Sequence, residues 1–107
     1  MLLVAALVVA FAASAQSRLI ECKMESKLLG KEKEYSIYLP SGYDKSDRSY
    51  PVLYLLHGAN GTHTSWPTSG NAKRIIDAVI KEGRSLPMVI VMPDASGEGE
   101  DHNGLNF

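Results

Sequence analysis

The chain has 107 residues, a formal net charge of −1 at pH 7 and one cysteine. This near-neutral balance excludes the basic surface that binding to nucleic acid or to an anionic membrane requires, so we expect no nucleic-acid partner. A single cysteine excludes an internal disulfide, and stability therefore has to come from an apolar core.

Residues 1–15 have the pattern of a secretory signal peptide. The apolar run from Leu2 to Ala13 is too short to span a bilayer, which needs about 17–25 residues. It ends in Ala13-Ser14-Ala15, a small-x-small cleavage pattern, although no positive charge precedes the run. The alternative is a short membrane anchor or a buried helix. We expect a secreted or periplasmic protein whose mature chain begins at Gln16 and makes no membrane contact after cleavage.

The first part of the mature chain predicts an antiparallel hairpin. Residues 20–24 and 35–39 alternate between apolar and polar side chains, and a turn at 28–31 separates them. One face carries Ile20, Cys22 and Met24, with Cys22 expected to be half-buried. Residues 40–48 predict a surface loop. The five tyrosines of the chain are expected to pack on the sheet.

The second part predicts a strand, a helix and a second strand. Residues 52–56 and 88–92 are continuous apolar runs, typical of parallel strands that helices cover on both faces. Between them, residues 71–82 predict a helix with Asn71 as N-cap and Gly83 as the stop. The helix has one apolar stripe, formed by Ala72, Ile75, Ile76, Val79 and Ile80. This order predicts a βαβ unit with parallel strands.

The predicted fold class is α/β, but the predicted elements cannot close a sheet. A hairpin and one βαβ unit leave sheet edges and an apolar face uncovered, so we expect a truncated chain.

The stretch from Tyr54 to Gly61, Tyr-Leu-Leu-His-Gly-Ala-Asn-Gly, places a glycine-containing loop after the first apolar strand. Such a loop lets the backbone approach a ligand and aim N–H groups at a developing negative charge. With residues 35–43, Trp66 and Val91-Met92-Pro93-Asp94 in the same order and spacing, the chain resembles the putative-esterase family of α/β-hydrolases. That family includes D-type esterases, S-formylglutathione hydrolases, feruloyl and acetyl-xylan esterases, and mycolyltransferases. The resemblance covers Ile20 to about Asp94.

The resemblance implies that residues 16–107 are the N-terminal portion of an α/β-hydrolase esterase domain. It places one oxyanion-hole donor at the backbone N–H of Ala59, which follows Gly58. No serine of the chain lies in Gly-x-Ser-x-Gly, and all three histidines precede the position that this fold gives to the catalytic base. We therefore expect no catalytic residue in this chain, a serine, acid and histidine beyond Phe107, and no activity from the fragment itself.

Four other side chains in or near the loop have candidate roles. His57, Asn60 and Trp66 are candidate substrate-pocket residues, with two alternatives: His57 braces the loop, and Trp66 packs the loop against the helix. His63 is expected to be a surface residue.

After the second strand, the acidic segment with Asp94, Glu98, Glu100, Asp101 and His102 offers possible metal ligands. Its spacing does not match an EF-hand, and we expect a solvated loop and no metal site.

By resemblance, the parent protein is a serine esterase that works through an acyl-enzyme without a cofactor. Its expected substrate is a small-molecule or carbohydrate ester, such as feruloyl or acetyl groups on polysaccharide. The alternatives are an acyltransferase of the same fold and a catalytically inactive carbohydrate-binding relative. The oligomeric state stays open.

Overall fold

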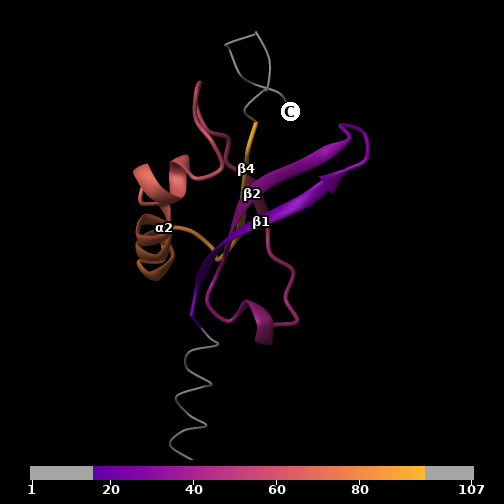
Figure 1. Ribbon diagram of the computed structural model, residues 1–107. Helices are drawn as coiled ribbons and strands as arrows, with labels where there is room; N and C mark the ends of the chain where they lie inside the picture. Colours follow the sequence, from indigo (N-terminus) through magenta and orange to yellow (C-terminus); the bar gives the residue numbers. More distant parts are fainter. Residues whose placement is uncertain (1–15, 96–107) are drawn as a thin grey trace, which may run out of the picture.

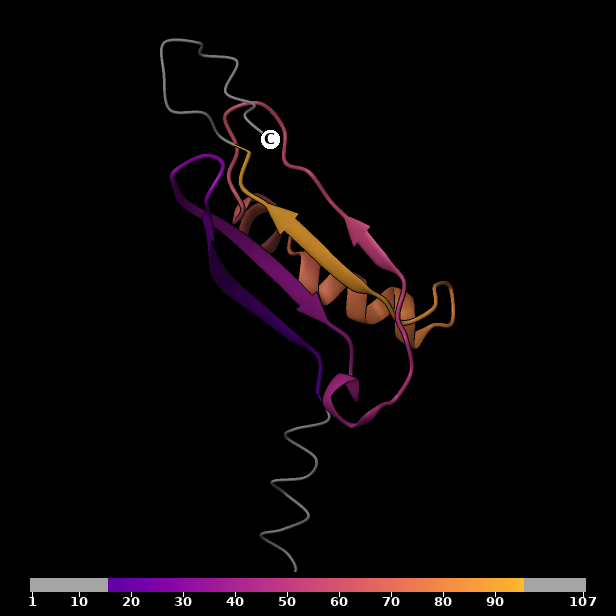
Figure 2. The same cartoon turned by 90° about the vertical axis from the view of Figure 1, so that its right-hand side faces the viewer.

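The computed structural model describes residues 16–95. The expected signal peptide and residues 96–107, which include Glu98, Glu100, Asp101 and His102, lie outside the described residues. A four-stranded mixed sheet has the order β1-β2-β4-β3, and a helix packs on one of its faces (Figures 1 and 2). The elements are β1 (Arg18–Ser26), β2 (Lys31–Leu39), a 3-10 turn η1 (Tyr43–Lys45), β3 (Val52–Tyr54), a π-helical turn η2 (Ser65–Ser69), α2 (Ala72–Lys81) and β4 (Val89–Pro93). No helix within residues 16–95 is long and apolar enough to cross a membrane.

The predicted hairpin is confirmed, and both strands are longer than the alternation indicated. β1 and β2 pair antiparallel from Arg18 opposite Leu39 to Ser26 opposite Lys31. The turn closes where the Gly30 N–H donates to the Ser26 carbonyl, and the φ of +66° at Gly30 favours glycine there. The face assignment needs a correction. Leu19, and not Ile20, belongs to the strand face that packs on the core, while Ile20 is 37% exposed.

The βαβ unit is also confirmed. β3 and β4 run parallel, with Val52 opposite Val89, and α2 connects them. β4 also pairs antiparallel with β2, so the sheet is mixed. β3 ends two residues earlier than expected. Within residues 16–95, α2 covers one face of the sheet and Tyr54 is 67% exposed, which agrees with the expectation that these elements leave an apolar face uncovered (Figure 2).

α2 begins and ends within one residue of the predicted bounds. Asn71 occupies the N-cap position, but it has a left-handed φ of 50° and makes no side-chain capping bond, so that part of the prediction is wrong. The stop at Gly83 is confirmed: the Gly83 N–H donates to the Ile80 carbonyl, and the Arg84 N–H to the Val79 carbonyl. This pair of bonds is a Schellman motif, with Gly83 at the left-handed position.

The core lies between the sheet and α2. Its buried members are Tyr38, Ala72, Ile90 and Met92, and Ile76 and Ile80 of the apolar stripe pack against them. Ile75, at the margin of the stripe, is 50% exposed. The Tyr38 hydroxyl donates to Asp77 at 2.6 Å, which satisfies its polar end inside the core. Tyr38 thus packs on the sheet as predicted, whereas Tyr43 and Tyr50 contact each other away from the strands, with ring centroids 5.5 Å apart.

Candidate active site

The candidate site is the loop of residues 57–64, which follows β3 and lies beside the carboxyl end of β4 (Figures 1 and 2). In parallel sheets, ligands bind beyond the carboxyl ends of the strands. β4 positions this loop, because Asp94 and Ala95 directly follow it and receive the side chains of both loop histidines. The fold therefore brings the loop to the edge of the sheet where α/β proteins bind their ligands.

His57 forms the first attachment of the loop. Its side chain is 1% exposed, and its Nε2 accepts a hydrogen bond from the Ala95 N–H at 2.9 Å. A backbone amide can only donate, so Nε2 carries no proton, and Nδ1 donates to the Gly58 carbonyl at 2.7 Å. Both ring nitrogens thus bond within the loop and to the segment after β4, which is the bracing arrangement, and a substrate contact of His57 stays a prediction.

The bond from His57 fixes the direction of the Gly58–Ala59 peptide. The Gly58 carbonyl accepts from His57 Nδ1 and from the Gly61 N–H at 3.0 Å. In a trans peptide the C=O and the N–H point in opposite directions, so the Ala59 N–H points away from His57. Gly58 and Ala59 are exposed, and within residues 16–95 the Ala59 N–H donates to no acceptor. A free, outward N–H at this position is what an oxyanion-hole donor needs.

The candidate pocket residue Asn60 completes a tight turn. It is exposed and has a φ of 63°, the left-handed third position of a four-residue turn that starts at Gly58. Gly61 closes this turn beneath the His57 ring. A Cβ on Gly61 would lie 3.0 Å from His57 Nδ1 and 2.8 Å from Ser65 Oγ, so a side chain does not fit there.

Trp66 holds the far side of the loop. Its indole N–H donates to the Leu56 carbonyl at 2.8 Å, and the side chain contacts Gly70 closely. It is the second residue of the π-helical turn that precedes α2, and it is 40% exposed. The side chain therefore fixes the return of the chain toward α2. Whether its exposed part also lines a substrate pocket stays a prediction.

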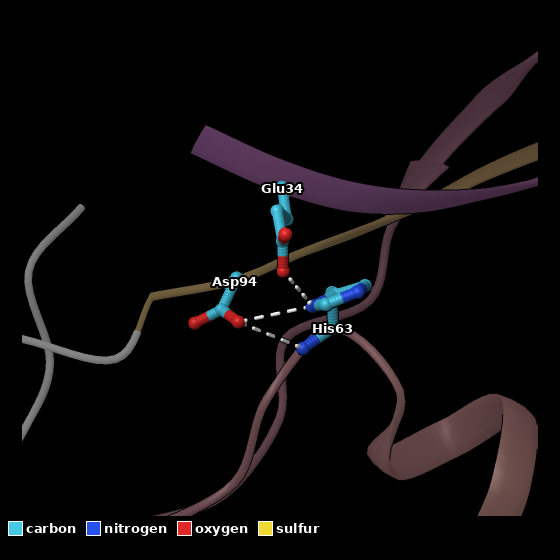
Figure 3. Close-up of side chains that lie close together, drawn as sticks. All are labelled: Glu34, His63 and Asp94. Atoms are coloured by element: carbon cyan, nitrogen blue, oxygen red, sulfur yellow. Dashed lines mark hydrogen bonds and ion pairs between the residues drawn. The ribbon is translucent and has the colours of Figure 1, made fainter. Parts of the chain in front are cut away.

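His63 forms the second attachment, and the expectation of a surface residue is wrong (Figure 3). It is 9% exposed, with Nδ1 3.0 Å from Asp94 Oδ2 and Nε2 3.0 Å from Glu21 Oε1. Glu34 Oε2 lies 3.5 Å from Nδ1. Its backbone is bound as well, because the carbonyl accepts from the buried Ser36 hydroxyl at 2.9 Å. The β1–β2 register explains the burial, since it places Glu21 opposite Ser36 next to the loop.

The charges around His63 favour its protonated form. Burial alone would lower its pKa, but hydrogen bonds to Asp94 and Glu21 and the charge of Glu34 outweigh it and raise the pKa above 6.5. Lys23 lies 3.9 Å from Glu34, and His57 Nε2 lies 4.0 Å from Asp94 Oδ1. An imidazolium with both nitrogens donating accounts for the two short contacts.

Three side chains of the same cluster lie close enough together to bind one metal ion. One ligand atom each from Glu34, His63 and Asp94 lies within 4.8 Å of the others. Asp94, which the sequence grouped with the acidic segment after β4, instead pairs with a histidine from a preceding loop. The hydrogen bonds of His63 use both of its nitrogens, so we interpret the group as an ion-pair cluster.

The family of the chain follows from comparison with known proteins. A family model described as Putative esterase matches residues 26–106. The chain belongs to this esterase family.

Two solved relatives share its fold. A ferulic acid esterase matches with a TM-score of 0.73 and 34% identity, over 78% of this chain and 32% of that chain. A CE1 ferulic acid esterase from Anaeromyces mucronatus, in complex with ferulic acid, matches with a TM-score of 0.65 and 30% identity, over 79% and 31% of the two chains. The chain thus spans about a third of the length of these esterases and corresponds to the N-terminal portion of their α/β-hydrolase fold.

A relative found by sequence comparison is also named a feruloyl esterase. An endo-1,4-beta-xylanase/feruloyl esterase of Xylanibacter ruminicola is 42% identical over 71 residues, which are 63% of this chain and 10% of that protein.

The sequence motifs identified the family but missed two features of the site: the Ala95 N–H and the carboxylates around His63. Asp94, quoted in the Val91–Asp94 motif, was the available signal for both, because it follows β4 where the loop attaches.

Proposed function

We propose that this chain supplies the first oxyanion-hole donor of an exported serine esterase that works through an acyl-enzyme. One observation carries the proposal: the Ala59 N–H points out of a braced loop at the carboxyl edge of the sheet and has no acceptor within residues 16–95. Such a fixed donor stabilises the negative charge of a tetrahedral intermediate. The serine, acid and histidine of this esterase belong to sequence outside residues 1–107, because no serine of the chain lies in a nucleophile elbow.

The proposed substrate is an ester of a hydroxycinnamic acid, such as ferulate, with carbohydrate. Support comes from relatives that are named feruloyl or ferulic acid esterases, one of them in complex with ferulic acid. Acetyl esters of polysaccharide are the second substrate class. A release assay that compares methyl ferulate with methyl acetate, which share the methanol leaving group, separates the two acyl groups, and a higher kcat/KM on the acetate would contradict the ferulate assignment.

The proposal of export depends on the sequence pattern of residues 1–15, which ends in Ala13-Ser14-Ala15. We expect the exported protein to begin at Gln16. An intact-mass measurement on protein recovered outside the cytoplasm checks this, and a mass that retains Leu2 to Ala13 would refute it.

The decisive test of the oxyanion assignment removes the Ala59 N–H from the full-length enzyme. Proline has no N–H, so Ala59→Pro should lower kcat by about 10²–10³ with a smaller effect on KM. The turn tolerates this change well, because proline is common at the second position of turns whose third residue is left-handed, as Asn60 is here.

Ala59→Ser keeps the N–H and is the matched control, with kcat expected close to that of the parent. Thermal unfolding of both variants checks that the loop change does not unfold the protein. A folded Ala59→Pro enzyme with parental kcat would show that Ala59 is not the donor.

A further inference from the structure

We propose that His63 is a positioning residue for the oxyanion-hole donor: its side chain, held by Asp94 and Glu21, fixes the second end of the 57–64 loop to the sheet. The inference rests on the proposed function, since it assigns a role relative to the Ala59 N–H. His63 itself contacts no part of the reaction and acts through the loop backbone.

The first step of the argument is that the donor lies between two attachments to the same short segment. His57 accepts from the Ala95 N–H, and His63 bonds to the Asp94 carboxylate with its ring at 3.0 Å and its backbone N–H at 3.4 Å. Residues 58–62 therefore span two attachments to the adjacent residues Asp94 and Ala95, of which Figure 3 shows the one between His63 and Asp94. A loop fixed at both ends can adopt few conformations, which is what a preorganised donor requires.

The second step is that the His63 end is fixed to three strands and the His57 end to one. Glu21 extends from β1, the Ser36 hydroxyl and the Glu34 carboxylate extend from β2, and Asp94 follows β4. All four contacts fall on His63, which is buried although the loop around Ala59 is exposed. Loss of this side chain would release the loop from β1 and weaken its hold on β4, while the His57 attachment stays in place.

The third step concerns charge. Glu21 and Asp94 can both accept from His63 only while both ring nitrogens carry protons. The surrounding charges are Glu21, Glu34 and Asp94, with Lys23 beside Glu34. Because the pKa of His63 is raised, the full attachment is present below pH 6.5 and is lost as pH rises through the folded-state pKa. Neutral His63 has one N–H and can keep only one of its two carboxylate partners as acceptor.

The test compares the full-length parent with His63→Phe and His63→Asn. Phenylalanine keeps the ring and removes both hydrogen bonds, whereas the asparagine amide can still donate to Asp94 but cannot titrate. We expect His63→Phe to lower kcat on p-nitrophenyl acetate about tenfold with KM nearly unchanged, and His63→Asn to recover most of that loss. Hydrogen exchange of the peptide that covers residues 57–64 should speed up in the phenylalanine variant and much less in the asparagine variant.

Melting temperatures measured at two pH values test the contribution of the charge on His63. The melting temperature of the parent should exceed that of His63→Asn by more at about pH 6 than at about pH 9. Glu21→Gln should shrink this difference, because it removes one of the two carboxylates that hold the imidazolium. Glu25→Gln, on the same strand and exposed, is the matched control and should leave the difference unchanged.

The outcomes separate the inference from the function on which it rests. Parental kcat and parental exchange in a folded His63→Phe variant would overturn the positioning role, even if Ala59→Pro is inactive. If the parent itself hydrolyses no ester, the proposed function fails, and the exchange and melting data still test whether His63 holds the loop. A melting temperature that Zn²⁺ raises in the parent but not in His63→Asn would overturn the inference in favour of a metal site on Glu34, His63 and Asp94.

Discussion

The two ends of the 57–64 loop use the same residue type on the same segment after β4, yet they differ in their electrostatics. His57 is a neutral ring that accepts from one backbone N–H and donates to one carbonyl. His63 lies among carboxylates that favour its charged form. Both hydrogen bonds of the His57 ring go to backbone groups, although Asp94 Oδ1 lies 4.0 Å from its Nε2. The hydrogen bonds of His63 go to carboxylates, so their strength depends on the charges of the ring and of those carboxylates. The His63 end should therefore respond to pH, in the direction that its raised pKa sets.

Among the tests of this difference between the His57 and His63 attachments, we expect the largest loss of stability from a substitution at His57. His57→Phe leaves the Ala95 N–H and the Gly58 carbonyl without their ring partner, and the side chain of Ala95 is 1% exposed. The buried Ala95 N–H then has no acceptor, which costs roughly 1–3 kcal/mol, whereas the exposed Gly58 carbonyl keeps the Gly61 N–H as its donor. The free energy of unfolding of the full-length protein should therefore fall by about that amount. Denaturant unfolding at about pH 8, where a free imidazole is neutral, measures it.

His57→Gln is the informative control for this change. Its side-chain oxygen can occupy the place of Nε2 and accept from Ala95, although it cannot also donate to Gly58. We expect it to recover part of the lost stability. If His57→Phe is as stable as the parent, the His57 bonds do not hold the loop, and His63 is then its main attachment.

The sequence predicted those parts of this picture that depend on local pattern. Alternation over residues 20–24 and 35–39 indicated the hairpin, and the apolar runs on either side of the helix stripe indicated the βαβ unit, because each pattern repeats with the period of its own element. The position of Gly83 fixed the end of α2 for the same reason: a left-handed residue is a local requirement.

The burial of His63 could not be read from such patterns. Its partners Glu21, Glu34 and Asp94 are far apart in the sequence, and only the pairing of β1, β2 and β4 brings them to one loop. Glu21 alternates with apolar residues and Glu34 ends a charged run, so both look like ordinary exposed strand positions. Asn71 lies at the N-cap as predicted, but its side-chain capping bond is absent, since asparagine can also adopt the left-handed backbone that it has here.

The smallest change in stability is expected from alanine substitutions at the two glycines of the loop, Gly58 and Gly61. A Cβ on Gly61 would lie 3.0 Å from both Cβ and Nδ1 of His57, whereas a Cβ on Gly58 would meet nothing within 4 Å among the described residues. Neither glycine has a positive φ, so alanine at either position differs only in the space that it needs. Gly61→Ala should push against the His57 ring and lower the free energy of unfolding by about 1–3 kcal/mol, as other overpacked sites do.

Gly58→Ala is the matched control for this prediction, with an expected change within about 0.5 kcal/mol, as at most exposed positions. The two variants share chemistry and loop, so the difference between their unfolding free energies measures the contacts of a Cβ at Gly61 with the His57 ring and with Ser65 Oγ at 2.8 Å. Equal stabilities would mean that the His57 ring shifts without loss when a methyl group is added beneath it. The His57 end would then be the adaptable attachment of the loop, and the comparison with His63 would be reversed.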